Sequence, residues 1–405
     1  MFSRKGISYL FVIMIISLTT LSVMNCGRTE KKDMTPEFTQ FLKSYEAKVI
    51  PLSKDLNLAY FNATTTGNQD LYKKMEDLQI QLSRIFANKE DFALLKKIKE
   101  SGTVTDPVLA RQLQLIYNSY LAKQIDEKKL EKMIQLQTEV EQKYSTYRAE
   151  VDGEKLTDNQ IEDILKTSTD SEKLKKTWMA SKQIGSVVKD QVLQLVKMRN
   201  EAAQELGFKN YHAMQLELSE QNPDSIEQLF NELDDLTRMS FASLKTDIDQ
   251  FLAKRYGISQ ADLMPWHYQN RFFQEAPKIY TVDLDKYYKN KDLVELTRKY
   301  YDGIGLNIDE MVKKSDLYER EGKYQHAYCT DIDREGDVRV VGNIQPNYNW
   351  MNTMLHEFGH AVYDEYHDRS LPWTLREPAH TFTTEAIAML FGRFASNPLW
   401  LKDVV

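Results

Sequence analysis

The 405-residue sequence has little of what interrupts a helix or cross-links a chain: 15 glycines, 10 prolines and two cysteines. The cysteines are Cys26 and Cys329. Cys26 directly follows an N-terminal leader and is expected to be acylated, which leaves Cys329 as the one other cysteine, so no internal disulfide is expected. A chain of this length buries enough apolar surface to fold without such cross-links. The scarcity of glycine and proline favours long, uninterrupted helices.

Two further absences limit the partners of the protein. The formal net charge is −7, and lysine and glutamate are interspersed rather than grouped in basic blocks, so no nucleic-acid surface is expected. Beyond residue 23 no apolar run is long enough to span a bilayer. Contact with a membrane is therefore expected through the N-terminus alone.

Residues 1–25 have the pattern of a secretory signal peptide, with Arg4 and Lys5 ahead of an apolar run. Cys26 follows at the position of the acylated cysteine of a bacterial lipoprotein, and residues 26–34 are expected to be a lipidated tether. An uncleaved membrane anchor is the alternative. Both interpretations predict an exported protein held at a bacterial membrane, on its periplasmic or cell-surface side.

The segment 35–306 shows apolar residues at i, i+3 and i+4, which predicts an almost entirely helical structure. The sequences TDNQ at 157–160 and TDSE at 169–172 predict capping boxes, and Gly207 and Gly257 predict helix ends. The long amphipathic stretches are 70–88, 127–149, 189–206 and 225–256. Taken alone, this part is also compatible with a helical bundle or solenoid that binds partners.

The pattern changes between residues 323 and 344. The segments 324–328 and 338–341 favour strands, with DREG at 333–336 as the turn between them. The edge of such a hairpin can hydrogen-bond an extended peptide. The alternative is a hairpin that only covers the core.

The stretch HEFGH at 356–360 contains candidate metal-binding and catalytic residues. Its two histidines are four positions apart, so on a helix they lie one turn apart on the same side and can bind one metal ion. Glu357 between them matches the H-E-x-x-H arrangement, in which the glutamate is the general base. Two surface histidines without a metal are the alternative for this pattern alone.

A catalytic zinc site needs a third protein ligand and one open position. Glu385 is the candidate, because one helix can end at Pro372 and a second helix can return after Pro378. Its neighbours in the sequence TEAIAML, residues 384–390, are mostly apolar, and a buried carboxylate there requires a metal or a partner. A solvent-facing glutamate is the alternative.

From His326 to Trp400 the sequence resembles the angiotensin-converting enzyme family of zinc peptidyl-dipeptidases. The resembling segments, in order, are HA at 326–327, DVRV at 337–340, HEFGH at 356–360, LPWTLRE at 371–377 and EAI at 385–387. Fainter similarity extends upstream, to NEAA at 200–203, RYG at 255–257 and PW at 265–266. HEFGH is also typical of the thimet oligopeptidase family, which is the close relative.

The resemblance implies a mainly α fold, a large helical channel-type metallopeptidase body with a short β-hairpin before the zinc helix, over residues 35–405. The implied activity is zinc-dependent hydrolysis of oligopeptides, of the peptidyl-dipeptidase kind. A thimet-type oligoendopeptidase is one alternative. A catalytically weak or inactive helical binding lipoprotein is the other.

The resemblance also implies the roles of single residues. The implied Zn²⁺ ligands are His356, His360 and Glu385. Glu357 would be the general base, and oligopeptide substrates would contact His326 and the backbone of Ala327.

Three departures from the family pattern matter. The family's glutamine that binds the terminal carboxylate of the substrate follows a tryptophan, and here Tyr268 stands at that position, with Gln269 one place on. Met389 stands where the family has an aspartate that supports a zinc histidine. Asp364, one turn beyond His360, is the candidate substitute, and an exposed aspartate is the alternative for this position. The resembling enzymes continue past the equivalent of Val405 and take a histidine and a tyrosine for the oxyanion from that region. The peptidase domain is therefore expected to be C-terminally incomplete, with weak activity in its 405-residue form.

Overall fold

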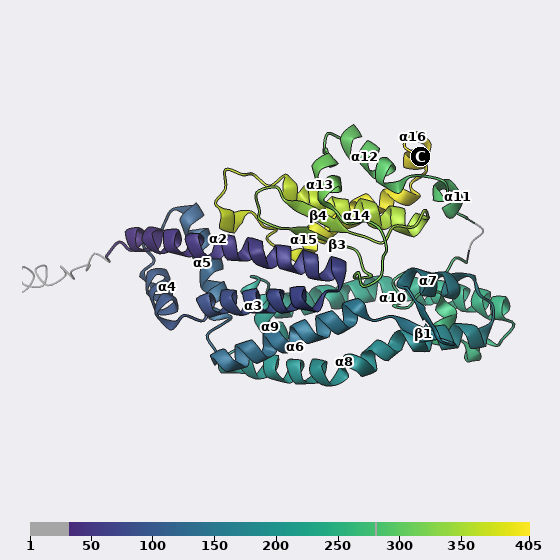
Figure 1. Ribbon diagram of the computed structural model, residues 1–405, viewed down its shortest axis with the longest axis horizontal. Helices are drawn as coiled ribbons and strands as arrows, with labels where there is room; N and C mark the ends of the chain where they lie inside the picture. Colours follow the sequence, from purple (N-terminus) through teal and green to yellow (C-terminus); the bar gives the residue numbers. More distant parts are fainter. Residues whose placement is uncertain (1–31, 280–281) are drawn as a thin grey trace, which may run out of the picture.

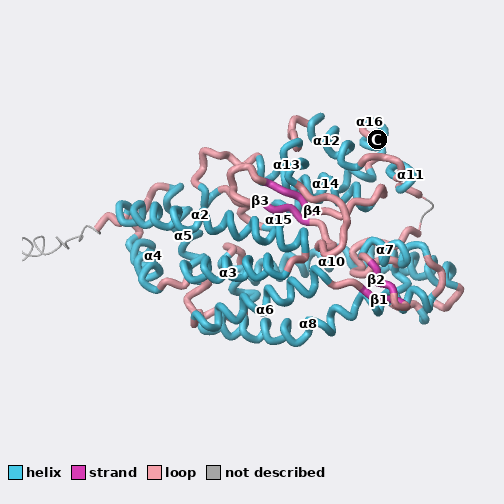
Figure 2. Tube along the Cα trace, viewed as in Figure 1, coloured by secondary structure: helices cyan, strands magenta, loops and turns pink. Residues whose placement is uncertain are grey.

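The computed structural model describes residues 32–279 and 282–405. These residues form a mainly α-helical fold (Figures 1 and 2). Of the residues that the structure describes, 69% are helical, and they contain fifteen α-helices and two short antiparallel hairpins. The predicted fold class, mainly α with a hairpin before the HEFGH helix, is confirmed.

The first five helices build the N-terminal part of the fold. They are α2 (Thr35–Thr66), α3 (Gln69–Phe86), α4 (Lys89–Ser101), α5 (Pro107–Leu121) and α6 (Glu127–Thr146). Side-chain caps define most of the starts, because the residue before each of α3 to α6 accepts backbone N–H groups of the first turn. Buried apolar side chains of α2, α4 and α5 share one core, which Trp373 from the C-terminal part joins.

The middle of the chain adds a second row of long helices. Its elements are β1 (Ala149–Val151), β2 (Glu154–Leu156), α7 (Asp158–Thr167), α8 (Ser171–Glu205), α9 (Tyr211–Leu218) and α10 (Pro223–Tyr256). α2 packs on α3, α3 on α6 and α6 on α8, so these helices lie in successive layers (Figure 1).

The hairpin of β1 and β2 corrects the expectation of a helix that continues to residue 149. α6 ends at Thr146, and the chain turns at Asp152 and Gly153, which have φ values of 52° and 87°. An Asp-Gly pair favours the tight turn in which both central residues have positive φ. This local signal outweighs the helical periodicity before it.

The helix ends follow the predicted signals in three cases out of four. Thr157 forms the expected capping box with Gln160, and Gly207 and Gly257 follow α8 and α10 with positive φ. The capping box predicted at Thr169 is wrong, because Asp170 is the N-cap of α8. A carboxylate at this position also interacts favourably with the helix dipole.

The stretch between α10 and α12 is less helical than predicted. Its described residues contain only the short elements η1 (Gln260–Asp262), η2 (Pro265–Tyr268) and α11 (Asp285–Tyr288). Gln269 and Phe273 have positive φ, which no helix accommodates.

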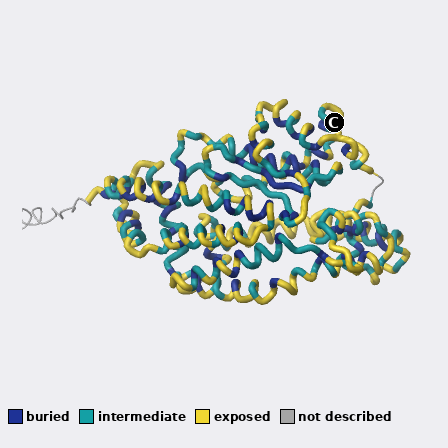
Figure 3. Tube along the Cα trace, viewed as in Figure 1, coloured by how far each residue is buried: buried dark blue, intermediate teal, exposed yellow. Residues whose placement is uncertain are grey.

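The C-terminal part packs around one central helix. Its elements are α12 (Leu293–Gly303), α13 (Asp309–Lys314), β3 (Tyr328–Asp331), β4 (Val338–Val341), α14 (Tyr348–Glu365), η3 (Trp373–Leu375), α15 (Thr381–Gly392), η4 (Arg393–Ser396) and α16 (Pro398–Asp403). α14 contacts α12, β3, β4 and α15. Figure 3 shows the buried chain concentrated here, along β4 and α14.

The predicted hairpin is present, but its first strand begins later than expected. Tyr324 and His326 lie in the loop before β3, which starts at Tyr328 opposite Val341. The loop backbone is held by other groups, because the Asn343 side chain donates to the Tyr324 carbonyl and the Tyr324 N–H donates to a carbonyl of α2.

Candidate metal centre

α14 presents the two histidines beside its buried face. Asn347 caps the start of the helix, because its side chain accepts a hydrogen bond from the backbone N–H of Trp350. The fully buried side chains of its inner face are Met351, Met354, Leu355 and Phe358. His356 and His360 flank this face, with side chains 24% and 14% exposed, so they are fixed by the helix and remain reachable.

Gly359 lets α15 approach α14 closely. A Cβ atom at this position would lie 2.9 Å from the Cα atom of Ala388, closer than real Cβ contacts allow. Glycine is therefore the residue that fits between the two helices. The approach places Glu385, one turn before Ala388, opposite the histidines.

The donor atoms of His356, His360 and Glu385 converge on one point. The two Nε2 atoms are 3.2 Å apart, and the Glu385 oxygens lie 3.5 Å from His356 Nε2 and 3.6 Å from His360 Nε2. Two ligands of a tetrahedral zinc ion, with bonds of about 2.0–2.2 Å, are about 3.3–3.6 Å apart. The three side chains therefore fit a zinc ion. Among the described residues they are the one group of this kind and spacing.

Comparison with known families agrees with this geometry. The sequence matches the family model of the angiotensin-converting enzyme peptidases over residues 32–405. The chain belongs to the angiotensin-converting enzyme family. The predicted resemblance is thus confirmed, and the protein is a member of a zinc-dependent peptidase family. A search for similar curated proteins found no match.

Glu357, the residue at the position of the family's general base, is buried against the hairpin. The backbone of Cys329 in β3 lies close to the carboxyl group of Glu357. Burial and then the nearby Glu385 carboxylate raise the pKa of Glu357 to about 8, while the Cys329 N–H opposes the rise. The carboxyl group is therefore a proton acceptor or donor near neutral pH.

Thr384 supports one of the histidines. Its hydroxyl oxygen lies 2.7 Å from His360 Nδ1. If Nε2 faces the metal, Nδ1 carries the proton and donates it to Thr384, which fixes the ring and its tautomer. The sequence analysis did not single out Thr384, although it directly precedes Glu385 and shares the helical turn that faces α14.

The structure does not place Asp364 where it could support a histidine of the metal centre in the expected way. Among the described residues its carboxylate has no hydrogen bond to His356 or His360; it faces Asp331 and Glu377, and their charges add to burial in raising its pKa to about 7. Met389, at the family's aspartate position, is 55% exposed. The hydrogen bond to His360 that we expected from Asp364 is formed by Thr384 instead.

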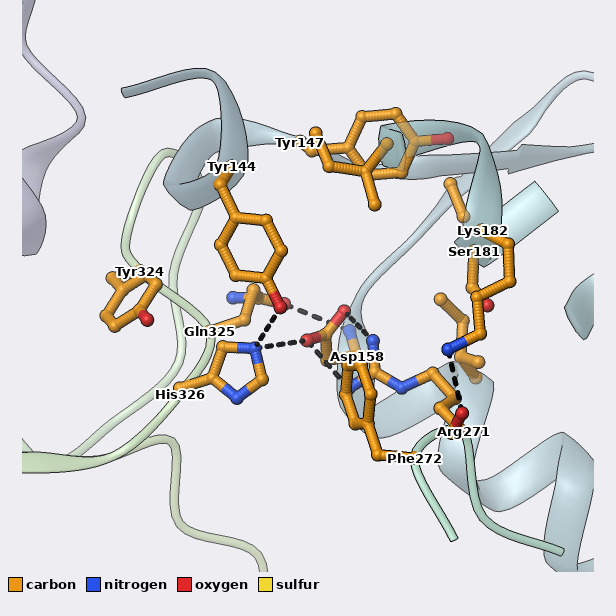
Figure 4. Close-up of a pocket in the computed structure, with 13 residues that line it drawn as sticks. Tyr144, Tyr147, Asp158, Ser181, Lys182, Arg271, Phe272, Tyr324, Gln325 and His326 are labelled. Carbon is orange, nitrogen blue, oxygen red and sulfur yellow. Dashed lines mark hydrogen bonds and ion pairs between the residues drawn. The ribbon is translucent and has the colours of Figure 1, made fainter. Parts of the chain in front are cut away.

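His326 lies in a cavity of its own. We call this cavity the His326 pocket, and it is lined by Tyr144, Asp158, Lys182, Arg271, Phe272 and His326 (Figure 4). His326 Nε2 is 3.1 Å from the Tyr144 hydroxyl and 3.9 Å from Asp158 Oδ2. Burial lowers the pKa of His326, which keeps the ring neutral near pH 7. The structure does not bring His326 into the group of three donors.

Ala327 links the His326 pocket to the strand that packs against Glu357. It joins His326 to β3, and Cys329 of that strand contacts Glu357. Three extended residues span at most about 10 Å, so the Cα atoms of His326 and Cys329 lie no farther apart than this.

The predicted lipid-anchor residue, Cys26, lies outside the described residues, as do the rest of the leader and the start of the tether. Within the described ranges, no helix has the length and apolarity needed to cross a bilayer.

Proposed function

We propose that this member of the angiotensin-converting enzyme family is a zinc peptidase of the peptidyl-dipeptidase kind, which hydrolyses oligopeptides. One observation carries the proposal: the donor atoms of His356, His360 and Glu385 lie at the separations of a tetrahedral zinc site. They leave a fourth position for a water or a substrate.

The protein residues have distinct tasks in this reaction. Zinc held by the three side chains supplies Lewis-acid chemistry, polarising a carbonyl and lowering the pKa of water. Glu357 accepts the proton of the attacking water and returns it to the leaving amine. Thr384 holds the proton of His360 on Nδ1.

The His326 pocket supports the dipeptidyl specificity. Arg271 is paired with Asp158 and Glu162, at 2.7 and 2.9 Å. Lys182 Nζ donates to the Arg271 carbonyl at 2.7 Å but forms no ion pair with any described residue. An ammonium group with spare donors favours a carboxylate, such as the C-terminus of a peptide.

Product analysis tests the specificity. Purified protein is incubated with zinc and with two versions of one peptide, carrying a free or an amidated C-terminus, and the products are identified by mass spectrometry. We expect sequential release of dipeptides from the free C-terminus and little cleavage of the amide. Internal cleavage of both versions would instead identify a thimet-type oligoendopeptidase. If the wild-type protein cleaved neither version of the peptide faster than Glu357→Gln protein does, the peptidase proposal would be contradicted.

We also propose that the protein is exported and anchored to a bacterial membrane through lipidated Cys26, with residues 35–405 as one peptidase domain. The leader sequence supports this proposal. Growth with a labelled fatty acid should label the wild-type protein and leave Cys26→Ser unlabelled. Equal labelling of both proteins, or of neither, would exclude the anchor.

A further inference from the structure

The side chain of Asn343 holds the loop that carries His326. Asn343 follows β4 and is only 1% exposed. Its Nδ2 atom donates to the backbone carbonyls of Tyr324 and Gln325, at 3.0 and 2.8 Å. These are the two residues directly before His326, so one amide group fixes the chain at the point where it enters the His326 pocket.

The same amide leaves its oxygen unsatisfied. Asn343 Oδ1 is buried and accepts no hydrogen bond from any described residue. A buried acceptor without a partner is unfavourable, and turning the amide over would set this oxygen against two carbonyl oxygens. The two donors therefore dictate the orientation of the amide. Because an apolar residue of the same shape would avoid the unsatisfied oxygen, asparagine at this position serves the geometry of the loop more than the stability of the fold.

Asn343 is in turn tied to the helix that carries the histidine ligands. Its backbone carbonyl accepts a hydrogen bond from Asn159 Nδ2 at 3.0 Å. The Asn159 Oδ1 atom accepts one from the indole N–H of Trp350, near the start of α14, at 2.9 Å. A continuous series of hydrogen bonds thus connects the start of α14 to the loop before His326.

The side chain of Gln325 ties the same loop to the carboxylate that faces His326. Its Oε1 atom accepts the backbone N–H of Asp158 at 3.0 Å (Figure 4). The Asp158 carboxylate lies 3.9 Å from His326 Nε2 and is paired with Arg271. The distance between the imidazole and this carboxylate therefore depends on where the loop holds Gln325.

His326 and Ala327 themselves form no backbone hydrogen bond within the described part of the chain. The β3–β4 ladder begins only at Tyr328, which lies opposite Val341. The N–H and C=O groups of His326 and Ala327 are therefore available to a bound peptide, but they do not hold the loop. The loop is positioned from its two ends, and Asn343 holds the first of them.

We propose that Asn343 is a positioning residue of the substrate site, which sets the place of the His326 ring and of the free backbone of Ala327. The inference rests on the proposed peptidase function, which makes this loop a substrate contact. Among the described residues, the hydrogen bonds of Asn343 reach the loop and α7 but neither the general base nor the metal donors. Its loss should therefore weaken substrate binding and leave the chemical step largely intact.

Kinetics of Asn343→Leu test this division. The substitution keeps the branched shape of the side chain and removes both donors. With added zinc and a peptide that has a free C-terminus, we expect KM to rise roughly tenfold, while kcat changes by less than about threefold.

A second readout needs neither zinc nor turnover. The pKa of His326 is followed by NMR in full-length protein with ¹³C-labelled histidine, and the signal is assigned with His326→Gln. Burial lowers this pKa in the wild type, so a loosened loop that admits water should raise it toward its ordinary value. The charges of Asp158 and Arg271, which act on it in opposite directions, are present in both proteins.

Asn57→Leu is the matched control. Asn57 Nδ2 also donates to two successive carbonyls of this part of the chain, those of Asp331 and Ile332, each at 3.1 Å. They lie at the end of β3 that is farther from His326. The substitution should therefore remove an equivalent pair of hydrogen bonds and leave both KM and the pKa of His326 unchanged.

Asn159→Leu is the second variant, and it decides the outcome if Asn343→Leu does not fold. It removes the two hydrogen bonds that link the Asn343 carbonyl to Trp350. Both readouts should shift in the same direction as in Asn343→Leu, but by a smaller amount.

The outcomes separate this inference from the proposed function. A raised KM with retained kcat and a raised pKa of His326, both unchanged in Asn57→Leu, support the inference. Unchanged values in the Asn343 and Asn159 variants, equal changes in Asn57→Leu, or a loss confined to kcat would overturn it. If the wild type cleaves no peptide, the peptidase proposal fails, and the NMR result alone decides whether Asn343 positions the loop.

Discussion

The two histidine nitrogens that face each other, His356 Nε2 and His360 Nε2, are 3.2 Å apart. Their lone pairs repel unless a proton or a cation lies between them. Burial lowers the pKa of both imidazoles, so near pH 7 they are neutral and able to bind a metal. The arrangement is thus imposed by the helices, which hold the donors ready for a cation.

Replacing Thr384 by valine tests the support of His360. The change keeps the shape of the side chain and removes the oxygen that lies 2.7 Å from His360 Nδ1. Loss of such a supporting hydrogen bond typically weakens metal binding about 10- to 100-fold. The zinc dissociation constant, measured by competition with a chelator, should rise by this amount. Thr383→Val, at the exposed neighbouring position, is the control; an equal effect of both changes would exclude the assigned role.

Asp364 should make the stability of the metal-free protein depend on pH. Its folded-state pKa of about 7 lies above the ordinary value near 3.9, so its contribution to stability is complete below pH 4 and is lost as the pH rises through 7. Asp364→Asn should match the wild type at pH 4 and exceed it at pH 8, by on the order of 2 kcal/mol.

Urea unfolding in EDTA at several pH values measures this difference. Asp403→Asn, at an exposed position on α16, should follow the wild type at every pH. A constant difference between Asp364→Asn and the wild type from pH 4 to pH 8 would contradict the raised pKa.

Pairing of α14 with α15 brings the ligands together, and Gly359 sets the distance between the two helices. Gly359→Ala should force α15 away from α14, because the new methyl group meets Ala388 Cα at 2.9 Å. We expect a loss of stability of about 1–3 kcal/mol and weaker zinc binding. Gly185→Ala is the control, since nothing lies within 4 Å of its added Cβ; it should stabilise α8 by about 0.5–1 kcal/mol. Unchanged zinc affinity of Gly359→Ala would contradict the close-packing account.

Elements with strong local signals were predicted well from the sequence. The helical periodicity of α14, the Thr157 capping box and the Gly257 helix end all depend on residues near one another in the chain. The later start of β3 depends on Asn343 and α2, which are distant in sequence and hold the preceding loop. The sequence therefore could not place Tyr324 and His326 outside the strand.

In the candidate site too, features set by residues near one another in the chain were predicted, and a feature set by contact between distant residues was not. The sequence singled out the residues whose donor atoms now converge, His356, His360 and Glu385, because residue type and spacing determine what a metal can bind. It assigned the support of a histidine to Asp364 by helical spacing alone. Which side chain hydrogen-bonds His360 depends on the packing of α15 against α14, and the structure places Thr384 beside His360.

The N-terminal and C-terminal parts of the chain are joined through the connection between α14 and α15. Trp373 from this connection is buried in the core of α2, α4 and α5, and its indole N–H donates to the Asp333 carbonyl near the end of the β3–β4 hairpin. Any cation that links α14 to α15 therefore restrains a segment anchored in both parts of the fold.

Zinc should raise the unfolding temperature of the whole protein. A ligand that binds only the folded state stabilises it by about 2.7 kcal/mol at 100 times its dissociation constant. Calorimetric scans with added zinc and with EDTA should show this shift for the wild type. Glu385→Ala, which lacks one ligand, should show a much smaller shift; equal shifts would place the stabilising zinc elsewhere.

The zinc content of purified protein, determined by mass spectrometry of the metal after dialysis, tests the central claim most directly. We expect one zinc ion per wild-type chain and a large loss in His356→Ala, His360→Ala and Glu385→Ala, with Glu377→Ala unchanged. Wild-type protein without zinc, or full zinc content after the loss of Glu385, would contradict the metal centre.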